Sequence, residues 1–219
     1  MTSTIAVVGG TGPQGRGLAY RFALAGHSVL LGSRNADSAE AKADEINAKL
    51  ELPLVSGRVN GDAVAEAEIV VLAVPWEGHA DLVASLAESL AGKIVISCVN
   101  PLGFDQHGPY GLVLEESAAQ EAQRLAPSAR VVGAFHHLAA LSLWRTPDAL
   151  DHEDVLVCGD DVEAKELVQD LAVAVTGKRG IDAGGLRLAR QLEPLTAVLI
   201  SINKRYKTRS GLAISGVES

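Results

Sequence analysis

The sequence has only two cysteines, Cys98 and Cys158, and each lies at the end of an apolar run of the kind that forms a strand. This placement favours buried free thiols in a reducing cytoplasm over a disulfide or a catalytic thiol. No group of His, Cys, Asp and Glu residues has the spacing of metal ligands. The sequence therefore predicts neither a disulfide framework nor a metal site.

Long apolar segments are also missing, because no uninterrupted run approaches the roughly 18–20 residues that span a bilayer. Residues 1–4 lead straight into the first predicted strand, so we expect no signal peptide and no membrane association. The 219 residues carry a net charge of −8, which argues against nucleic acid as a partner. With 47% hydrophobic residues, the chain can bury one substantial core. These features predict a cytoplasmic protein.

Short β-branched runs alternate with helical stretches along the chain, which is typical of a parallel α/β sheet. Strands are predicted at residues 5–8, 28–31, 54–55, 69–74, 94–97, 130–134 and 155–158. Helical sequence occupies residues 17–25, 37–50, 63–67, 78–90, 117–125, 162–175 and 186–206. A proline- and glycine-rich loop over residues 100–111 interrupts this rhythm. We predict a Rossmann-type doubly wound parallel sheet with a small C-terminal part made of helix and loop.

The stretch from residue 9 to residue 15 follows the first predicted strand directly and opens a helical segment. Within it, Gly10, Gly12 and Gly15 form the pattern Gly-x-Gly-x-x-Gly in a strand–turn–helix context. Such a loop needs glycine for a tight turn, for close approach to a pyrophosphate, and for packing of helix on strand. The free N–H groups at the helix start then attract an anion. The loop predicts dinucleotide binding, although similar turns also occur for packing reasons alone.

The end of the second predicted strand lacks the acidic residue that usually binds a free ribose 2′-hydroxyl, about 20 residues past the glycines. Ser33 and Arg34 stand there instead. A hydroxyl and a planar guanidinium suit a 2′-phosphate. We therefore predict NADP rather than NAD, while noting that an arginine at a strand end is also a common surface residue.

Three later loops follow predicted strands, where ligands of open α/β sheets bind. These loops are residues 74–79, 100–102 and 135–138. His136 follows the sixth strand, where the nicotinamide half of a dinucleotide would lie, so we expect it to contact ligand rather than serve as polar filler. His79 and His107 have no obvious partner in the sequence, and we expect both to be exposed to solvent.

The segment from Lys178 to Arg209 contains eight basic and two acidic residues, a net charge of +6 in a chain of net −8. A charge run usually covers a solvated face, but its confinement to one segment of an acidic protein indicates attraction of an anionic ligand. The segment also carries an apolar stripe at helical spacing, which predicts packing on the core or on a second subunit. The stripe consists of Leu188, Leu192, Leu195, Leu199 and Ile202.

Motifs along essentially the whole chain resemble those of the NADP reductases that use the deazaflavin coenzyme F420. They lie at residues 8–15, 32–34, 74–77, 157–161, 182–184 and 192–196. The resemblance implies reversible hydride transfer between C5 of the reduced deazaflavin and C4 of the nicotinamide of NADP+. It also implies a homodimer in which a Rossmann domain binds NADP and a smaller C-terminal part closes the coenzyme cleft. We place these parts at residues 1–140 and 141–219.

The resemblance also assigns site residues. For NADP these are Thr11, Gly12, Pro13 and Gln14 at the pyrophosphate, Ser33 and Arg34 at the 2′-phosphate, and Val74, Asn100 and Ala140 elsewhere. For F420 they are His136 and Leu138, followed by Pro101, Leu102 and Leu212. The chain departs from some members at Ser38, where they have a lysine, and at Ala139, where they have a proline. Both coenzymes carry hydride at a ring carbon, so stacking can supply most of the acceleration. We expect no general acid or base, and a positioning role only for His136.

Two other functions stay open at this point. An NADP-dependent imine or ketone reductase on the same fold would need a positioned proton donor, and only His136, His137 and Tyr110 offer one. A non-enzymatic NADP-sensing regulator would keep the dinucleotide site and use the cleft to recognise a protein. The basic segment favours the F420 enzyme, because that coenzyme has a strongly anionic tail of phosphate and glutamate.

Overall fold

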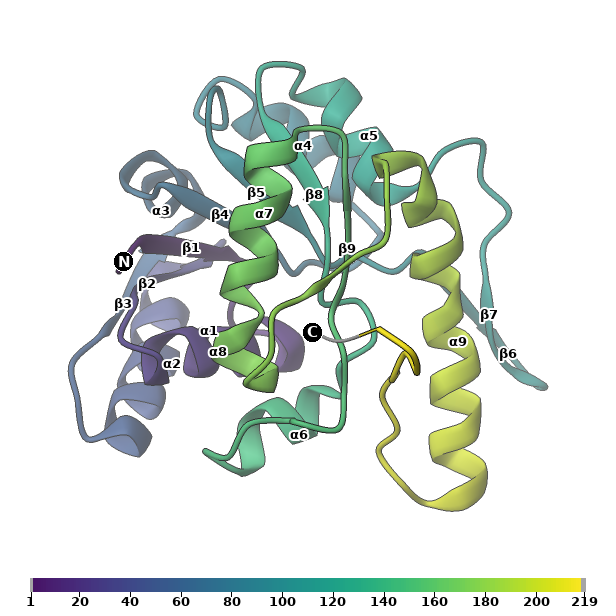
Figure 1. The fold of residues 1–219 in the computed structure, drawn as a ribbon. Coiled ribbons are helices and arrows are strands. Elements are labelled where there is room, and N and C mark those ends of the chain that lie inside the picture. Colours follow the sequence, from purple (N-terminus) through teal and green to yellow (C-terminus); the bar gives the residue numbers. More distant parts are fainter. Residues whose placement is uncertain (1, 218–219) are drawn as a thin grey trace.

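An eight-stranded sheet runs through the computed structural model, which describes residues 2–217 (Figure 1). In spatial order the strands are β10 (Ile181–Asp182), β9 (Leu156–Gly159), β8 (Arg130–Gly133), β5 (Ile94–Ser97), β4 (Ile69–Leu72), β1 (Thr4–Val8), β2 (Ser28–Ser33) and β3 (Val55–Val59). Neighbouring strands pair in parallel, except that β9 runs antiparallel to β8. The stretch from β3 to β8 has the Rossmann strand order, with its switch point between β1 and β4. The predicted fold class is confirmed.

Helices cover both faces of this sheet. One face carries α1 (Pro13–Leu24), α2 (Ala36–Leu50), α6 (Ala140–Arg145), α7 (Val162–Leu171) and α8 (Val173–Thr176). The opposite face carries α3 (Asn60–Glu66), α4 (His79–Leu86) and α5 (Ala118–Leu125). Successive residues of β1 point into different cores, with Ile5 and Val7 on one side and Ala6 and Val8 on the other. Because both faces are covered, the central strand β4 is apolar throughout.

Helix α1 is fixed to α6, and this contact places the chain that follows β8. Gly17 allows the approach, since a Cβ atom there would lie 2.6 Å from the Cβ of Leu143. Arg21 is only 1% exposed, and its guanidinium donates to the carbonyl oxygens of residues 142, 143, 147 and 148. These bonds satisfy a buried charge that would otherwise be costly. They hold α6 against α1.

Residues 100–111, expected as an irregular loop, contain a hairpin of β6 (Leu102–Asp105) and β7 (Gly108–Gly111). The carboxylate of Asp105 accepts hydrogen bonds from the backbone N–H groups of His107 and Gly108, which closes the turn. The hairpin packs on α9 (Ala189–Tyr206), because Gly111 lets the backbone approach Pro194. Glycine and proline are uncommon inside strands, so the sequence of these residues did not predict the hairpin.

Helix α9 follows the short 3₁₀ helix η1 (Leu186–Leu188) and is joined to α5 through a buried carboxylate. Glu193 accepts hydrogen bonds from the N–H groups of Ala118 (2.9 Å) and Ala119 (3.0 Å) at the start of α5. Burial raises the pKa of this carboxyl to about 7. A side chain far along the sequence therefore caps α5 and sets the position of α9.

The predictions for His79 and His107 have different outcomes. His107 is exposed, as expected. His79 is fully buried, and its Nδ1 lies 2.7 Å from Oε2 of Glu121 on α5, so the prediction of solvent exposure is wrong. Its partner lies 42 residues away and becomes a neighbour only through packing of α4 on α5.

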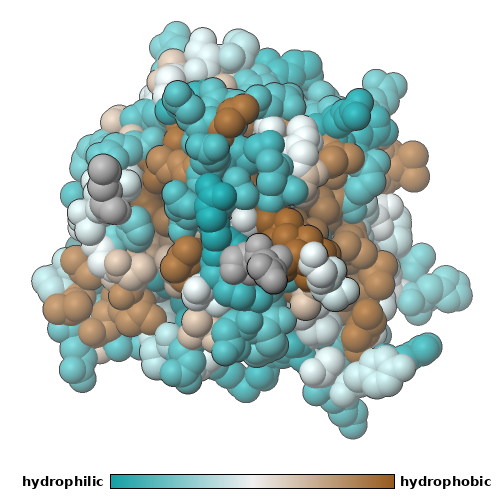
Figure 2. All heavy atoms as spheres, in the orientation of Figure 1, coloured by the Kyte–Doolittle hydropathy of each residue, from teal (hydrophilic) through white to brown (hydrophobic). Residues whose placement is uncertain are grey.

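Exposed apolar side chains gather on α9 and on the hairpin beside it. Figure 2 shows hydrophobic surface on the side of the molecule where α9 lies. Leu192 and Leu199 of the predicted apolar stripe are buried against the chain, whereas Leu188 and Ile202 stay more than a third exposed. The other large apolar side chains exposed here are Val198, Tyr206, Phe104 and Tyr110.

Candidate active site

The loop between β1 and α1 lies at the carboxyl edge of the sheet. Its glycines differ in how closely other atoms surround them. A Cβ atom on Gly10 would lie 2.5 Å from Cδ1 of Leu31, and one on Gly15 would lie 2.8 Å from the Cα of Gly10. A Cβ atom on Gly12 would meet only the carbonyl oxygen of Gly9, at 3.5 Å. Gly12 lines a cavity and precedes α1 without any side-chain cap. The N–H groups of the helix start therefore remain available to an anion.

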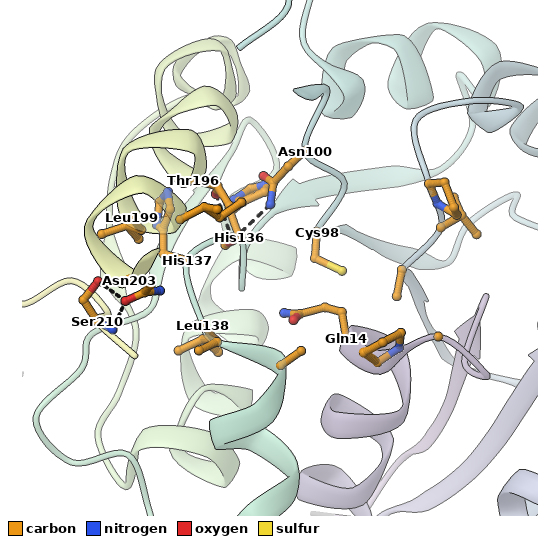
Figure 3. Close-up of a pocket in the computed structure, with 18 residues that line it drawn as sticks. Gln14, Cys98, Asn100, His136, His137, Leu138, Thr196, Leu199, Asn203 and Ser210 are labelled. Carbon is orange, nitrogen blue, oxygen red and sulfur yellow. Dashed lines mark hydrogen bonds between the residues drawn. The ribbon is translucent and has the colours of Figure 1, made fainter. Parts of the chain in front are cut away.

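A cavity of about 400 Å³ lies between this loop, the ends of β4, β5 and β8, and helix α9 (Figure 3). We call it the coenzyme cavity. Eight predicted site residues line it: Gly12, Pro13, Gln14, Val74, Asn100, His136, Leu138 and Ala140. Its other polar lining residues are Cys98, His137, Thr196, Asn203 and Ser210. Of these, His137 and Thr196 belong to segments that the sequence analysis singled out, whereas Asn203 and Ser210 were not expected at the site.

A second cavity, of about 420 Å³, lies on the other side of the same loop. It brings together Thr11, Ser33 and Arg34, all predicted from the sequence. Val74 and Pro75 line both cavities, so the two are neighbours across the end of β4. Asn60, at the start of α3, also lines the second cavity. Its Oδ1 is buried without a partner in the described chain, and the sequence offered no signal for it.

The backbone holds His136 firmly while its imidazole stays without a hydrogen-bond partner. Its carbonyl oxygen accepts from Nδ2 of Asn100 (3.1 Å) and from Oγ1 of Thr196 (3.0 Å), as Figure 3 shows. The preceding Phe135 has a φ of +61°, and its carbonyl oxygen accepts from Nε2 of Gln14 (3.2 Å). Such a left-handed conformation is uncommon outside glycine and persists only where its surroundings enforce it.

Burial, and then the neighbouring His137, lower the pKa of His136 to about 3. Its imidazole is therefore neutral at physiological pH. The residue is only 3% exposed, and within the described chain both of its ring nitrogens are buried without a hydrogen-bond partner. His137 differs, because its Nε2 lies 2.7 Å from the carbonyl oxygen of Leu192. The pair thus provides one anchored histidine and one with free hydrogen-bonding capacity.

Asn100 adds another unpartnered polar atom to this cavity. Its Nδ2 is occupied by the carbonyl of His136, and its Oδ1 is buried without a partner among the described residues. A buried polar atom left unsatisfied costs about 1–3 kcal/mol. Asn100 and His136 therefore offer hydrogen bonds that a polar, planar ligand can complete, and the site fits a nicotinamide with its carboxamide.

Both cysteines are buried free thiols, as predicted. Burial raises the pKa of each thiol to about 12, so neither is a thiolate at neutral pH. Cys98 lines the coenzyme cavity, and its Sγ donates to the carbonyl oxygen of Leu72. The side chain of Cys98 therefore contributes to the shape of this cavity.

Comparison with known proteins places the chain in a family. The model of the family described as NADP oxidoreductase, coenzyme F420-dependent, matches residues 4–101. The chain is 37% identical to the F420-dependent NADP reductase of Methanothermobacter thermautotrophicus, over 99% of this chain and 97% of that protein. It is also 37% identical to the F420-dependent NADP reductase of Methanocaldococcus jannaschii, over 98% of this chain and 99% of that protein. The chain belongs to the F420-dependent NADP reductase family.

A solved structure of another protein supports this assignment. The crystal structure of a putative F420-dependent NADP reductase from Arthrobacter sp. FB24 superposes with a TM-score of 0.80 and 33% identity, covering 97% of this chain and all of that one. The resemblance stated from the sequence motifs is confirmed. It extends beyond residues 4–101 into the C-terminal half, where α9 lies.

Three residues that the family resemblance assigned to F420 do not line the coenzyme cavity. After Asn100 the chain turns away into the hairpin, so Pro101 lines a separate cavity of about 190 Å³ and Leu102 begins β6. Leu212 lies in the tail, where its carbonyl oxygen accepts from the N–H of Asp154 (2.7 Å). Their contact with F420 stays a prediction.

The basic C-terminal segment does not form one charged surface. Lys178 pairs with Asp154 and Arg179 with Asp170, both away from the cavity. Arg190 donates to a backbone carbonyl. The attraction of an anionic ligand by this segment stays a prediction, and these three residues already have partners within the chain. The residues that remain near the coenzyme cavity follow the end of α9.

None of the helices within residues 2–217 has the length and apolarity to cross a bilayer. Over the same residues, no three His, Cys, Asp or Glu side chains come together as a set that could hold a metal ion.

Proposed function

We propose that this chain carries out reversible hydride transfer between reduced coenzyme F420 and NADP+, with NADP lying across the two neighbouring cavities. Family membership confirms the reaction expected from the sequence. The observation that carries the residue assignment is the position of Gly12, Asn100 and His136 on one cavity, each with room or hydrogen-bonding capacity for a ligand.

NADP is held at three points. The start of α1 binds the pyrophosphate, since Gly12 leaves its N–H groups open. Ser33 and Arg34 bind the 2′-phosphate; Arg34 is exposed and makes no ion pair among the described residues. Asn100 would hold the nicotinamide, because its free Oδ1 can accept a hydrogen bond from the carboxamide.

When bound, the reduced deazaflavin supplies hydride at its C5, and the nicotinamide of NADP+ accepts it at C4. The chain's own task is to hold the two rings together and keep water out, for which Leu138, Leu199 and Ile200 provide an apolar lining. His136 stays neutral and positions the ring through contact and hydrogen bonding. Among the described residues neither of its ring nitrogens has a hydrogen-bond partner, and we propose that it does not act as a general acid or base.

The test is optical. Protein, NADPH and oxidised F420 are mixed, and the absorbance of the deazaflavin is followed, with NADH in place of NADPH as the control. We expect loss of deazaflavin absorbance with NADPH and far slower loss with NADH. A protein that oxidises NADPH with cyclic imines or ketones but never with F420 would refute this proposal in favour of the second reductase. NADPH binding without turnover of any of these substrates would favour the regulator.

The proposal extends to assembly. Large apolar side chains of α9 and the hairpin are exposed on one side of the molecule, and exposed apolar patches mark interaction sites. We propose a homodimer through this face. We also propose that residues 141–219 close the coenzyme cleft. This part is not a separate layer, because its strands β9 and β10 extend the sheet that contains β1. Light scattering at micromolar concentration should give a mass near twice that of the 22.8 kDa chain. A mass of one chain would contradict it.

Two further proposals concern where the protein is located and which class of ligand it binds. We propose a cytoplasmic location, in keeping with two free buried thiols. We also propose that the ligands are small anionic coenzymes rather than nucleic acid, in keeping with a net charge of −8.

A further inference from the structure

Glu193 is a buried carboxylate of α9 that does not line the coenzyme cavity. It is 2% exposed, and each of its two oxygens accepts one hydrogen bond from the start of α5, from the N–H groups of Ala118 and Ala119. A negative charge is favoured at this end of a helix. A neutral amide of the same size cannot replace both bonds, because its NH₂ group would face one of the two N–H donors.

Helix α5 already has a capping box at its start, in which Ser117 and Gln120 bind each other's backbone N–H groups. The helix therefore has its own signal for where to begin. Glu193 satisfies two more N–H groups, but it does so with a carboxylate whose burial is unfavourable and raises its pKa to about 7. What this contact adds is a fixed position of α9 against α5.

The residues on either side of Glu193 bind the two histidines of the coenzyme cavity. The carbonyl oxygen of Leu192 lies 2.7 Å from Nε2 of His137, and this nitrogen carries the hydrogen because a carbonyl oxygen only accepts. Oγ1 of Thr196 donates to the carbonyl oxygen of His136 at 3.0 Å (Figure 3). The segment of α9 that Glu193 fixes to α5 is therefore the segment that holds His136 and His137 in place.

Pro194 makes this part of α9 dependent on contacts with other segments. Proline has no N–H group, so the carbonyl oxygen of Arg190 receives no helical hydrogen bond from residue 194. The proline ring packs on the hairpin, where a Cβ atom on Gly111 would lie 2.5 Å from the Cβ of Pro194. With one of its own hydrogen bonds missing, the turn is held by its neighbours, among them the two N–H groups that Glu193 accepts from.

We propose that Glu193 is a positioning residue for hydride transfer, which fixes α9 to α5 and so sets the place of the His136 imidazole in the coenzyme cavity. This inference rests on the proposed function and adds a residue that touches neither coenzyme. Transfer between two stacked rings depends on near-attack geometry, and a misplacement of about 1 Å can cost about 100-fold in rate. Loss of the anchor should therefore lower kcat, whereas NADP affinity, which we assign to the loop before α1, should change little.

The test compares two variants that each turn a carboxylate at the start of a helix into an amide. E193Q releases α9 from α5. The control D161N alters the carboxylate of Asp161, which caps α7 by accepting from the N–H of Ala164 (2.8 Å) and lines neither cavity. Values of kcat and KM for NADPH and F420 are measured at pH 8, where Glu193 is mostly ionised, and thermal unfolding is recorded for each variant.

E193Q should lower kcat about 5- to 50-fold and leave the KM of NADPH unchanged. In the His136→Ala background the same substitution should cause no further loss, because the imidazole that Glu193 positions is absent and effects in one network do not add. D161N should keep the kcat of the wild type. Thr196→Val removes the bond to the carbonyl of His136 directly and should reproduce the kcat loss, so it carries the test if E193Q does not fold.

A spectroscopic measurement tests the anchor without coenzymes or turnover. In the wild type the Nε2–H of His137 should give a slowly exchanging proton resonance, which is assigned by its absence in His137→Gln. In E193Q this proton should exchange with water about five- to tenfold faster, because a weakened hydrogen bond opens more often. In D161N the exchange rate should equal that of the wild type.

Three results would overturn the positioning role. Additive losses of kcat in the combined E193Q and His136→Ala variant would show that Glu193 does not act through His136. An equal kcat loss in D161N would show a general effect of removing a helix cap, and an unchanged exchange rate of the His137 proton in E193Q would show that Glu193 does not hold this turn. The proposed function fails separately, if the wild type does not reduce F420 with NADPH, and the exchange measurement still decides whether Glu193 is the anchor.

Discussion

Substituting two glycines of the same loop distinguishes a position that leaves room for a ligand from one that is enclosed by the fold. Gly12 has φ −73° and ψ 162°, which alanine adopts freely, and its Cβ would meet only one protein atom at 3.5 Å. Gly15 is enclosed, because its Cβ would lie 2.8 Å from the Cα of Gly10 and 2.9 Å from the carbonyl oxygen of Gly9. Both contacts are with backbone, which cannot swing aside. The two substitutions should therefore act on different free energies.

For Gly12→Ala we expect the free energy of unfolding to stay unchanged or rise by about 0.4–1 kcal/mol, because alanine restricts the unfolded chain. The added methyl group occupies the surface against which the pyrophosphate lies, and overpacking of this kind costs about 1–3 kcal/mol. NADP affinity should fall roughly 5- to 150-fold. For Gly15→Ala the overpacking falls on the fold, so stability should drop by about 1–3 kcal/mol.

Calorimetric titration with NADP+ and thermal unfolding of each variant measure the two quantities. At roughly 2–4 °C per kcal/mol for a chain of this size, Gly15→Ala should melt at a lower temperature than the wild type, and Gly12→Ala at the same temperature or a higher one. Gly12→Ala that binds NADP+ as tightly as the wild type would refute the placement of the pyrophosphate over this residue. Loss of stability in Gly12→Ala would show that its space is needed for packing after all.

Three other substitutions test the site and its support. Arg34→Ala should weaken NADP+ binding roughly 10- to 150-fold, the value of a charge-assisted hydrogen bond of about 1.5–3 kcal/mol, with NAD+ affinity unchanged; equal losses would contradict the 2′-phosphate assignment. His136→Ala should keep turnover within about 100-fold of the wild type and raise the KM of F420 more than that of NADPH; a loss of about four decades rescued by imidazole would identify it as a proton carrier. Glu193 has a pKa raised from 4.5 to about 7, so its stabilisation is present below pH 4.5 and is lost as the pH rises towards 7. The melting temperature of the wild type should therefore fall from pH 5 to 8 relative to that of Glu193→Gln, and parallel profiles would show that Glu193 does not titrate in this range.

Local rules determined much of this protein from its sequence. Glycine is the residue that a strand-to-helix turn around a phosphate requires, so Gly10, Gly12 and Gly15 could be recognised without coordinates. The position of Ser33 and Arg34 beside this loop was also predictable, because the end of β2 lies next to the switch point of such a sheet, whereas their contact with the 2′-phosphate stays a prediction. Apolar runs without alternation predicted strands buried on both faces. Each of these signals depends on residues close together in the chain.

The tertiary structure decided what depends on residues far apart. Packing of α4 on α5 buries His79 against Glu121, and α9 brings Thr196 to the carbonyl of His136. Several motif residues that identify the family prove to hold the scaffold: the carboxylate of Asp160 accepts from the N–H of Leu186, and that of Asp161 caps α7. Asn60 reaches the second cavity only because α3 follows β3 at the edge of the sheet. A side chain's partner across 26 to 60 residues is set by the packing of whole elements, which no local pattern encodes.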